Sequence, residues 1–118
     1  MQEVFTALRA LLAKQAQHLV VKTDSATEYY CNTAFMQKNK KPVFFGAVSI
    51  KKSYVSVHLM ASYLEPKILQ DLSPALLKRM QGKACFNFKK LEPELFDELD
   101  AYVVQCLYYY RQSGYLKP

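Results

Sequence analysis

Apolar residues recur at helical spacing over the first part of the chain. Val4, Phe5, Leu8, Leu11 and Leu12 follow an i, i+3, i+4 pattern, with Thr6, Arg9 and two alanines between them. Such a stripe is typical of an amphipathic helix that packs one side on a core. The pattern predicts a helix over residues 3–17.

The spacing then changes to runs that are rich in β-branched and aromatic residues, which favour strands. A turn is expected at Asp24-Ser25 and a polar loop over residues 37–42. We predict four strands in this region: one beginning at Leu19, then Thr27–Phe35, Val43–Ile50 and Tyr54–Met60.

The pattern becomes helical again after Leu64. Pro66–Leu72 indicates a short helix or turn, and Ser73-Pro74 is a strong start signal for a helix. We expect Gly82 to end that helix and Ala84–Phe88 to form a last strand. The C-terminal helix is predicted to begin at Glu92-Pro93 and to end at Gly114, with one apolar side: Leu95, Leu99, Tyr102, Val103, Cys106 and Tyr110.

The predicted order is α-β-β-β-β-α-β-α. Strands joined by short turns pair antiparallel, and helices at both ends of the chain suit one layer beside the sheet. We therefore predict an α+β two-layer sandwich, with the N- and C-terminal helices on one face. The length of 118 residues fits a single domain, 1–118.

The predicted hairpin allows the two faces of its sheet to be assigned. If Lys51-Lys52 is a two-residue turn, Ile50 pairs with Ser53 and Ser49 with Tyr54. The face assigned to the core holds Phe44, Gly46, Val48, Val55, Val57 and Leu59. The other face mixes aromatic, small and polar residues, a composition typical of contact surfaces. Its candidate ligand or subunit contacts are Phe45, Tyr54, Ser56, His58 and Met60.

Catalysis has little support in the sequence. The only histidines are His18 and His58, and no nucleophile elbow or glycine-rich phosphate loop is present. Ser56 lies two residues from His58 on the same strand face, yet no orienting acid accompanies them. We expect a non-enzymatic protein without catalytic or cofactor-binding residues.

The three cysteines, Cys31, Cys85 and Cys106, are an odd number in apolar surroundings, so we expect reduced thiols and a cytoplasmic protein. Their spacing does not match a zinc site, and no metal ligands are assigned. The longest apolar runs are far shorter than a membrane span, so no membrane partner is expected.

Charge raises the question of nucleic acid. The net charge is +6, and Lys78, Arg79 and Lys83 form a candidate basic patch. Phe86 and Phe88 alternate along a predicted strand, which favours a core position over a stacking platform. We expect only weak, non-specific binding and do not count nucleic acid among the main partners.

Three segments carry a resemblance to a known family: Lys40–Val48 (KKPVFFGAV), Tyr54–Met60 (YVSVHLM) and Lys78–Phe88 (KRMQGKACFNF). In this order, over roughly residues 27–113, the chain resembles the YdhG/YdeI-like family of small bacterial proteins of unknown function. The resemblance implies an α+β fold related to frataxin and a cytosolic location. The chain departs from the family pattern at Lys51-Lys52, where a glycine is expected, and this leaves the turn type open.

The resemblance also implies one alternative function, because a branch of the family is linked to intracellular iron handling. The acids of this chain gather at Glu92, Glu94, Asp97, Glu98 and Asp100. They lie in the first turns of the predicted last helix, where carboxylates oppose the helix dipole. We therefore expect no specific iron binding.

The leading hypothesis is a domain that binds a protein or small-molecule partner through the open sheet face, with a homodimer as one option. An iron chaperone and a weak nucleic-acid binder remain the alternatives.

Overall fold

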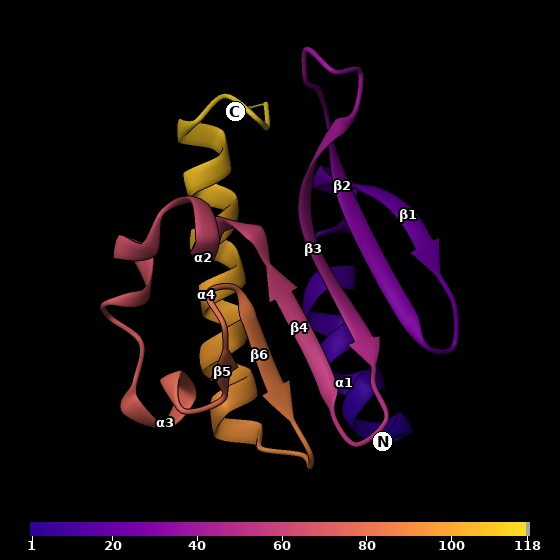
Figure 1. Ribbon diagram of the computed structural model, residues 1–118, viewed down its shortest axis with the longest axis vertical. Coiled ribbons are helices and arrows are strands. Elements are labelled where there is room, and N and C mark those ends of the chain that lie inside the picture. Colours follow the sequence, from indigo (N-terminus) through magenta and orange to yellow (C-terminus); the bar gives the residue numbers. More distant parts are fainter. Residues whose placement is uncertain (118) are drawn as a thin grey trace.

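The computed structural model describes residues 1–117 as a six-stranded antiparallel sheet with helices (Figure 1). The strands lie in the order β1-β2-β3-β4-β6-β5. The strands are β1 (Val20–Asp24), β2 (Glu28–Met36), β3 (Pro42–Ile50), β4 (Val55–Leu59), β5 (Met80–Gln81) and β6 (Cys85–Phe88). The helices are α1 (Gln2–Ala13), α2 (Met60–Leu64), α3 (Pro74–Leu77) and α4 (Pro93–Gln112), with 3₁₀ turns η1 (Ala16–His18) and η2 (Pro66–Leu69).

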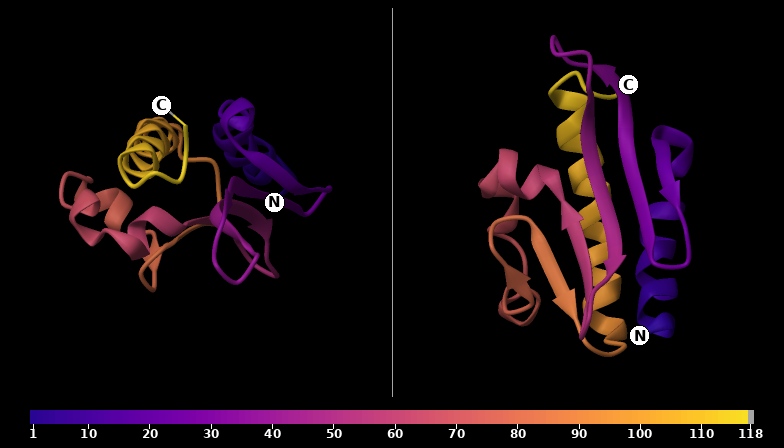
Figure 2. Two further views of the ribbon diagram at one scale, coloured as in Figure 1. Left: turned by 90° about the horizontal axis from the view of Figure 1, so that it is seen from above. Right: turned by 45° about the vertical axis from the view of Figure 1, so that its right-hand side comes forward.

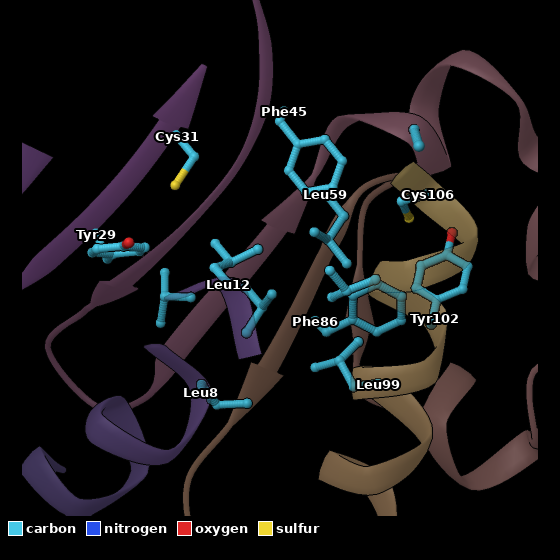
Figure 3. Close-up of a cluster of buried hydrophobic side chains, with 14 of the residues drawn as sticks. Leu8, Leu12, Tyr29, Cys31, Phe45, Leu59, Phe86, Leu99, Tyr102 and Cys106 are labelled. Carbon is cyan, nitrogen blue, oxygen red and sulfur yellow. The ribbon is translucent and has the colours of Figure 1, made fainter. Parts of the chain in front are cut away.

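The two long helices, α1 and α4, contact each other and lie on the same side of the sheet (Figure 2). The core fills the space between these helices and the sheet (Figure 3). Its largest fully buried side chains are Tyr102, Tyr110, Phe5, Phe45, Phe86 and Phe88. The opposite face of the sheet is left without a long helix. The α+β class predicted from the sequence is therefore confirmed.

The N-terminal helix ends earlier than its apolar stripe predicts. Val4, Phe5, Leu8 and Leu12 are buried as expected, but α1 stops at Ala13. The chain then tightens, because Gln15 donates its N–H to the Leu12 carbonyl and His18 donates to Gln15. The resulting 3₁₀ turn directs the chain into β1.

The last helix follows its predicted pattern closely. Leu99, Tyr102, Val103, Cys106 and Tyr110 are all buried. Gly114 has φ +84°, and the chain reverses there as expected. The N–H of Tyr115 donates to the Tyr110 carbonyl and that of Gly114 to the Arg111 carbonyl, the two bonds of a Schellman motif.

Two predicted elements are different in the structure. Helix α3 covers only Pro74–Leu77, although Ser73 caps it as predicted by accepting the Leu76 N–H. Gly82 (φ +71°) does not end a helix but lies in the turn between β5 and β6. Met60 is not the end of a strand, because α2 begins there.

The hairpin between β3 and β4 has a longer loop than the predicted two-residue turn. Ile50 pairs with Val55 and Ser49 with Ser56, while the Lys51 N–H donates to the Tyr54 carbonyl. The register is thus shifted by two residues. Because side chains alternate with a period of two, this shift leaves the faces of the hairpin unchanged.

One hydrogen-bonded pair is buried where α2 meets α4. The Ser62 and Tyr102 hydroxyls are 2.6 Å apart, and both residues have no exposed surface. No helix in the described part of the chain combines the length and apolar character needed to cross a membrane.

Candidate functional site

The candidate site is the face of the sheet that α1 and α4 leave uncovered. Strand pairing aligns two rows of side chains across it. The first row is polar: Glu28, Ser49, Ser56 and Asn87 lie opposite one another on β2, β3, β4 and β6. The second row is mixed: Tyr30, Ala47, His58 and Cys85 on the same four strands. The side chains at the centre of this face are small and those at its sides are larger, so its surface is uneven.

Phe44 contacts the rings of two members of the second row, Tyr30 and His58. The ring centroids of Tyr30 and Phe44 are 4.6 Å apart with planes at 31°. The Phe44 centroid lies 5.2 Å from that of His58, which meets it edge-on at 79°. Lys22 lies over the Tyr30 ring, with its Nζ 5.1 Å from the ring centroid. All three rings are half-buried, because each lies against a neighbour.

A β-bulge in β3 decides which phenylalanine joins this cluster. Cys31 pairs with Gly46 and Asn32 with Phe44, so Phe45 is an extra residue without a partner on β2. Phe45 turns into the core, where its ring lies 5.1 Å from that of Tyr110 and only 1% of the residue is exposed. The assignment of Phe45 to the open face, and of Phe44 to the core, is therefore wrong.

The other predicted contact residues are distributed around this face. Ser56 and His58 lie in its two rows, as expected from the hairpin. Tyr54 is the last residue of the β3–β4 loop and is half-buried. Met60, at the first position of α2, is also half-buried and leaves the strand alternation. The structure thus brings Ser56 and His58 together with Tyr30 and Phe44 rather than with Phe45.

The surroundings of the His58 imidazole favour its neutral form. Burial lowers its pKa from the usual 6.5, because the charged form would lose hydration. Within residues 1–117 no hydrogen bond joins His58 to Ser56. The pair therefore lacks the contact that would activate a serine nucleophile.

The polar row has its own hydrogen bonds. The Ser49 hydroxyl donates to the Glu28 carboxylate at 3.2 Å, and the Asn87 amide donates to Gln81 Oε1 at 3.3 Å. The amide oxygen of Asn87 is buried and has no partner among the described residues. A buried acceptor without a partner costs free energy.

The predicted basic patch is split. Lys78 and Arg79 line a hollow of about 470 Å³ beside Asn87, together with Lys89 and Lys90. Arg79 is paired with Glu92 at 2.6 Å, which lowers the pKa of that carboxyl through a side-chain hydrogen bond. Lys83 does not line the hollow, because its Nζ lies 5.8 Å from the ring centroid of Tyr63.

Three of the five clustered acids hold α4 to other elements. Glu92 pairs with Arg79, Asp100 with Lys14 at 2.8 Å, and Glu98 accepts both the N–H and the hydroxyl of Ser73. No group of three or more His, Cys, Asp or Glu that could hold a metal ion occurs in residues 1–117.

The cysteines are free thiols. Burial raises the pKa of Cys31 to about 11 and that of Cys106 to about 12, so both stay protonated in the core. Cys85 is half-buried on the open face. Cys31 faces α1 and α4 instead, since its partner on β3 is Gly46, so the two thiols lie on opposite faces of the sheet.

Tyr30 and Phe44 are the site residues that sequence reasoning missed. Tyr30 lies in a strand that was predicted but not assigned a face. In the run Phe44-Phe45-Gly46 two large side chains precede a glycine, so large and small residues do not alternate along the strand. This was the only signal of a bulge in the sequence. Comparison of the chain with protein-family models, curated proteins and solved structures gives no match.

Proposed function

We propose that this protein is a binding domain that holds a protein partner against the open face of its sheet. The observation that carries the proposal is the half-buried Tyr30–Phe44–His58 cluster beside a polar row, on the face opposite α1 and α4. Aromatic residues ringed by hydrogen-bonding groups are typical of non-obligate interfaces.

The size of the face suits such a contact. Strands of two to nine residues, 34 residues together, cover an area of about 540 Å² at the usual strand spacing and rise. One partner contributes about 800 Å² to a standard protein–protein interface. The strands alone thus supply roughly two thirds of that area, and the loops beside them would contribute the rest.

Charge favours a partner that is acidic. The strand and hairpin segments, residues 20–59 and 80–90, hold nine Lys and Arg against two Asp and Glu. The rest of the chain holds seven against eight. Because a second copy would carry the same excess of cations in these segments, an acidic protein surface fits better than a homodimer.

We also propose that the protein is non-enzymatic and cytoplasmic. The free thiols of Cys31, Cys85 and Cys106 support a reducing compartment. The resemblance to the YdhG/YdeI-like family and to the frataxin fold stays a prediction. Iron handling gains no support, because three of the clustered acids serve as structural contacts.

Nucleic acid also gains little support from this face. Stacking of a base requires a free ring face. Tyr30 contacts Lys22 and Phe44, and Phe44 also contacts His58. Each of the three rings is therefore already in contact with another side chain.

The test is a pair of double variants used as bait in an extract of the source organism. Phe44→Glu with His58→Glu places two carboxylates on the open face, and we expect loss of an acidic partner that the wild type retains. Ala101→Glu with Gln105→Glu adds the same charge to the exposed side of α4 and should retain the partner. Circular dichroism checks that both variants fold.

Sedimentation of the purified protein tests the homodimer option. If the wild type is a dimer and the Phe44 and His58 substitutions dissociate it, then the partner on this face is a second copy of the chain and not an acidic protein. A monomer whose captured proteins are the same for wild type and for the Phe44/His58 variant would refute the proposed role of this face.

A further inference from the structure

A separate groove of about 1020 Å³ lies at the end of the molecule where the chain terminates. It is bounded by the turn after α1, the last residues of β2 and the segment that follows α4. Its apolar lining comes from Phe35, Met36, Tyr115 and Leu116. Ligand pockets in proteins commonly have volumes of 300–1,000 Å³, so the groove is large enough for a small organic molecule.

The Schellman turn at Gly114 builds one wall. It reverses the chain after α4 and places the Tyr115 ring 5.3 Å from that of Tyr110 and 5.4 Å from that of Phe35. Tyr110 in turn contacts Phe45 in the core. The wall is thus held by a continuous series of rings that reaches from the core to the surface, so the groove exists before any ligand enters.

The end of β2, which adjoins this wall, exposes apolar side chains. Phe35 is 44% exposed and Met36 is 55% exposed, although both belong to a strand whose other residues are largely paired and packed. Large apolar residues that gather around a concave surface mark ligand sites more often than single exposed ones do. An apolar ligand body placed between Phe35 and Leu116 would cover both.

The charged residues of the groove are all basic. Arg111 and Lys117 line it and take part in none of the three salt bridges found within residues 1–117, and His18 adds an imidazole. No Asp or Glu occurs anywhere in residues 4–23, 29–64 or 101–118, the segments that supply every lining residue. An anion bound here would therefore meet two cations that form no salt bridge within residues 1–117.

We propose that this groove binds an amphipathic organic anion, whose apolar chain or ring lies along Phe35, Met36 and Leu116 and whose carboxylate meets Arg111 and Lys117. The guanidinium of Arg111 supplies paired N–H donors that match a carboxylate. The open sheet face plays no part in this site, so each of the two proposals can fail alone.

Calorimetric titration with decanoate tests the proposal, with decanol as the uncharged ligand of equal chain length. Decanoate is expected to bind saturably at one site per chain, and decanol about tenfold more weakly or worse. Higher salt should weaken decanoate but not decanol. Absence of saturable decanoate binding, or equal binding of both ligands, would overturn the proposal.

Variants locate the site. Arg111→Gln with Lys117→Gln should weaken decanoate about tenfold or more and leave decanol unchanged. Lys51→Gln with Lys52→Gln removes the same charge from the loop at the other end of β3, and should change decanoate binding by less than about twofold. Met36→Ser removes an exposed apolar wall residue and should weaken both ligands. Equal losses from the two charge variants would show that decanoate binds through net charge alone and would refute the groove.

Discussion

Replacing Gly46 by alanine tests the geometry that separates Phe44 from Phe45. Gly46 follows the bulge in β3 and pairs with Leu59 on β4. A Cβ at this position would lie 2.8 Å from the carbonyl oxygen of His58 and 3.0 Å from Cδ2 of Leu59. The shorter contact is with main chain that is held in a ladder on both sides, so it cannot be relieved by a side-chain rotation.

The expected sign follows from two opposing effects. Alanine restricts the unfolded chain more than glycine does, which stabilises the folded state by about 0.4–1 kcal/mol at a site without strain. Overpacking of a tight site costs about 1–3 kcal/mol. The clash should win, and the free energy of unfolding should fall by about 1–2 kcal/mol, which corresponds to a melting temperature lower by roughly 4–8 °C.

Urea unfolding followed by far-UV circular dichroism measures this change. Ala47→Gly at the next position provides the control, because it reports the value of a Cβ in the same strand without the clash; we expect a loss of about 0.5–1 kcal/mol. A Gly46→Ala variant as stable as the wild type, or more stable, would refute the close approach of β3 to β4. It would also put in doubt the bulge that turns Phe44 outward.

Two further predictions concern a buried hydroxyl pair and one imidazole. Tyr102→Phe or Ser62→Ala alone should each lower the free energy of unfolding by about 1–3 kcal/mol, because each leaves the other hydroxyl unpaired. The double variant should lose less than the sum of the two single losses. Strict additivity in urea unfolding would contradict the pairing. The lowered pKa of His58 means that the unfolded state binds more protons below pH 6.5, so stability should decline as pH falls from 7 through this range. His58→Gln should remove that part of the decline, while Glu92, whose carboxyl pKa is lowered, contributes only as pH falls below 4.5. An unchanged pH profile in His58→Gln, compared with His18→Gln as an exposed control, would contradict the burial argument.

The sequence determined the features that depend on near neighbours. The Ser73 cap and the reversal at Gly114 were predictable, because each rests on contacts within about five residues. The buried side of α4 was predictable because its apolar residues recur at helical spacing. The faces of β3 and β4 were assigned correctly beyond the bulge although the loop length was wrong. A register error of two residues preserves side-chain alternation, whereas an error of one would not.

Features that depend on a distant partner could not be predicted in this way. Met80–Gln81 follows a helix start signal, yet it forms a strand because β6 offers it a ladder. Helix α1 ends at Ala13 because the chain must turn to reach β2. In each case the local pattern allowed two conformations, and pairing elsewhere in the fold selected one.

The candidate sites belong to this second kind. Alternation alone assigned Phe44 to the core, and only the unpaired position of Phe45 opposite β2 exchanged the two rings. Likewise, Phe35 and Tyr115 are eighty residues apart in the chain, and the sheet and the Schellman turn bring their rings within 5.4 Å. Composition and periodicity indicate which residues are apolar enough to be buried. They do not indicate which of two neighbouring apolar residues enters the core. The packing of the helices on the sheet decides that, because it determines which side chains fit into the core.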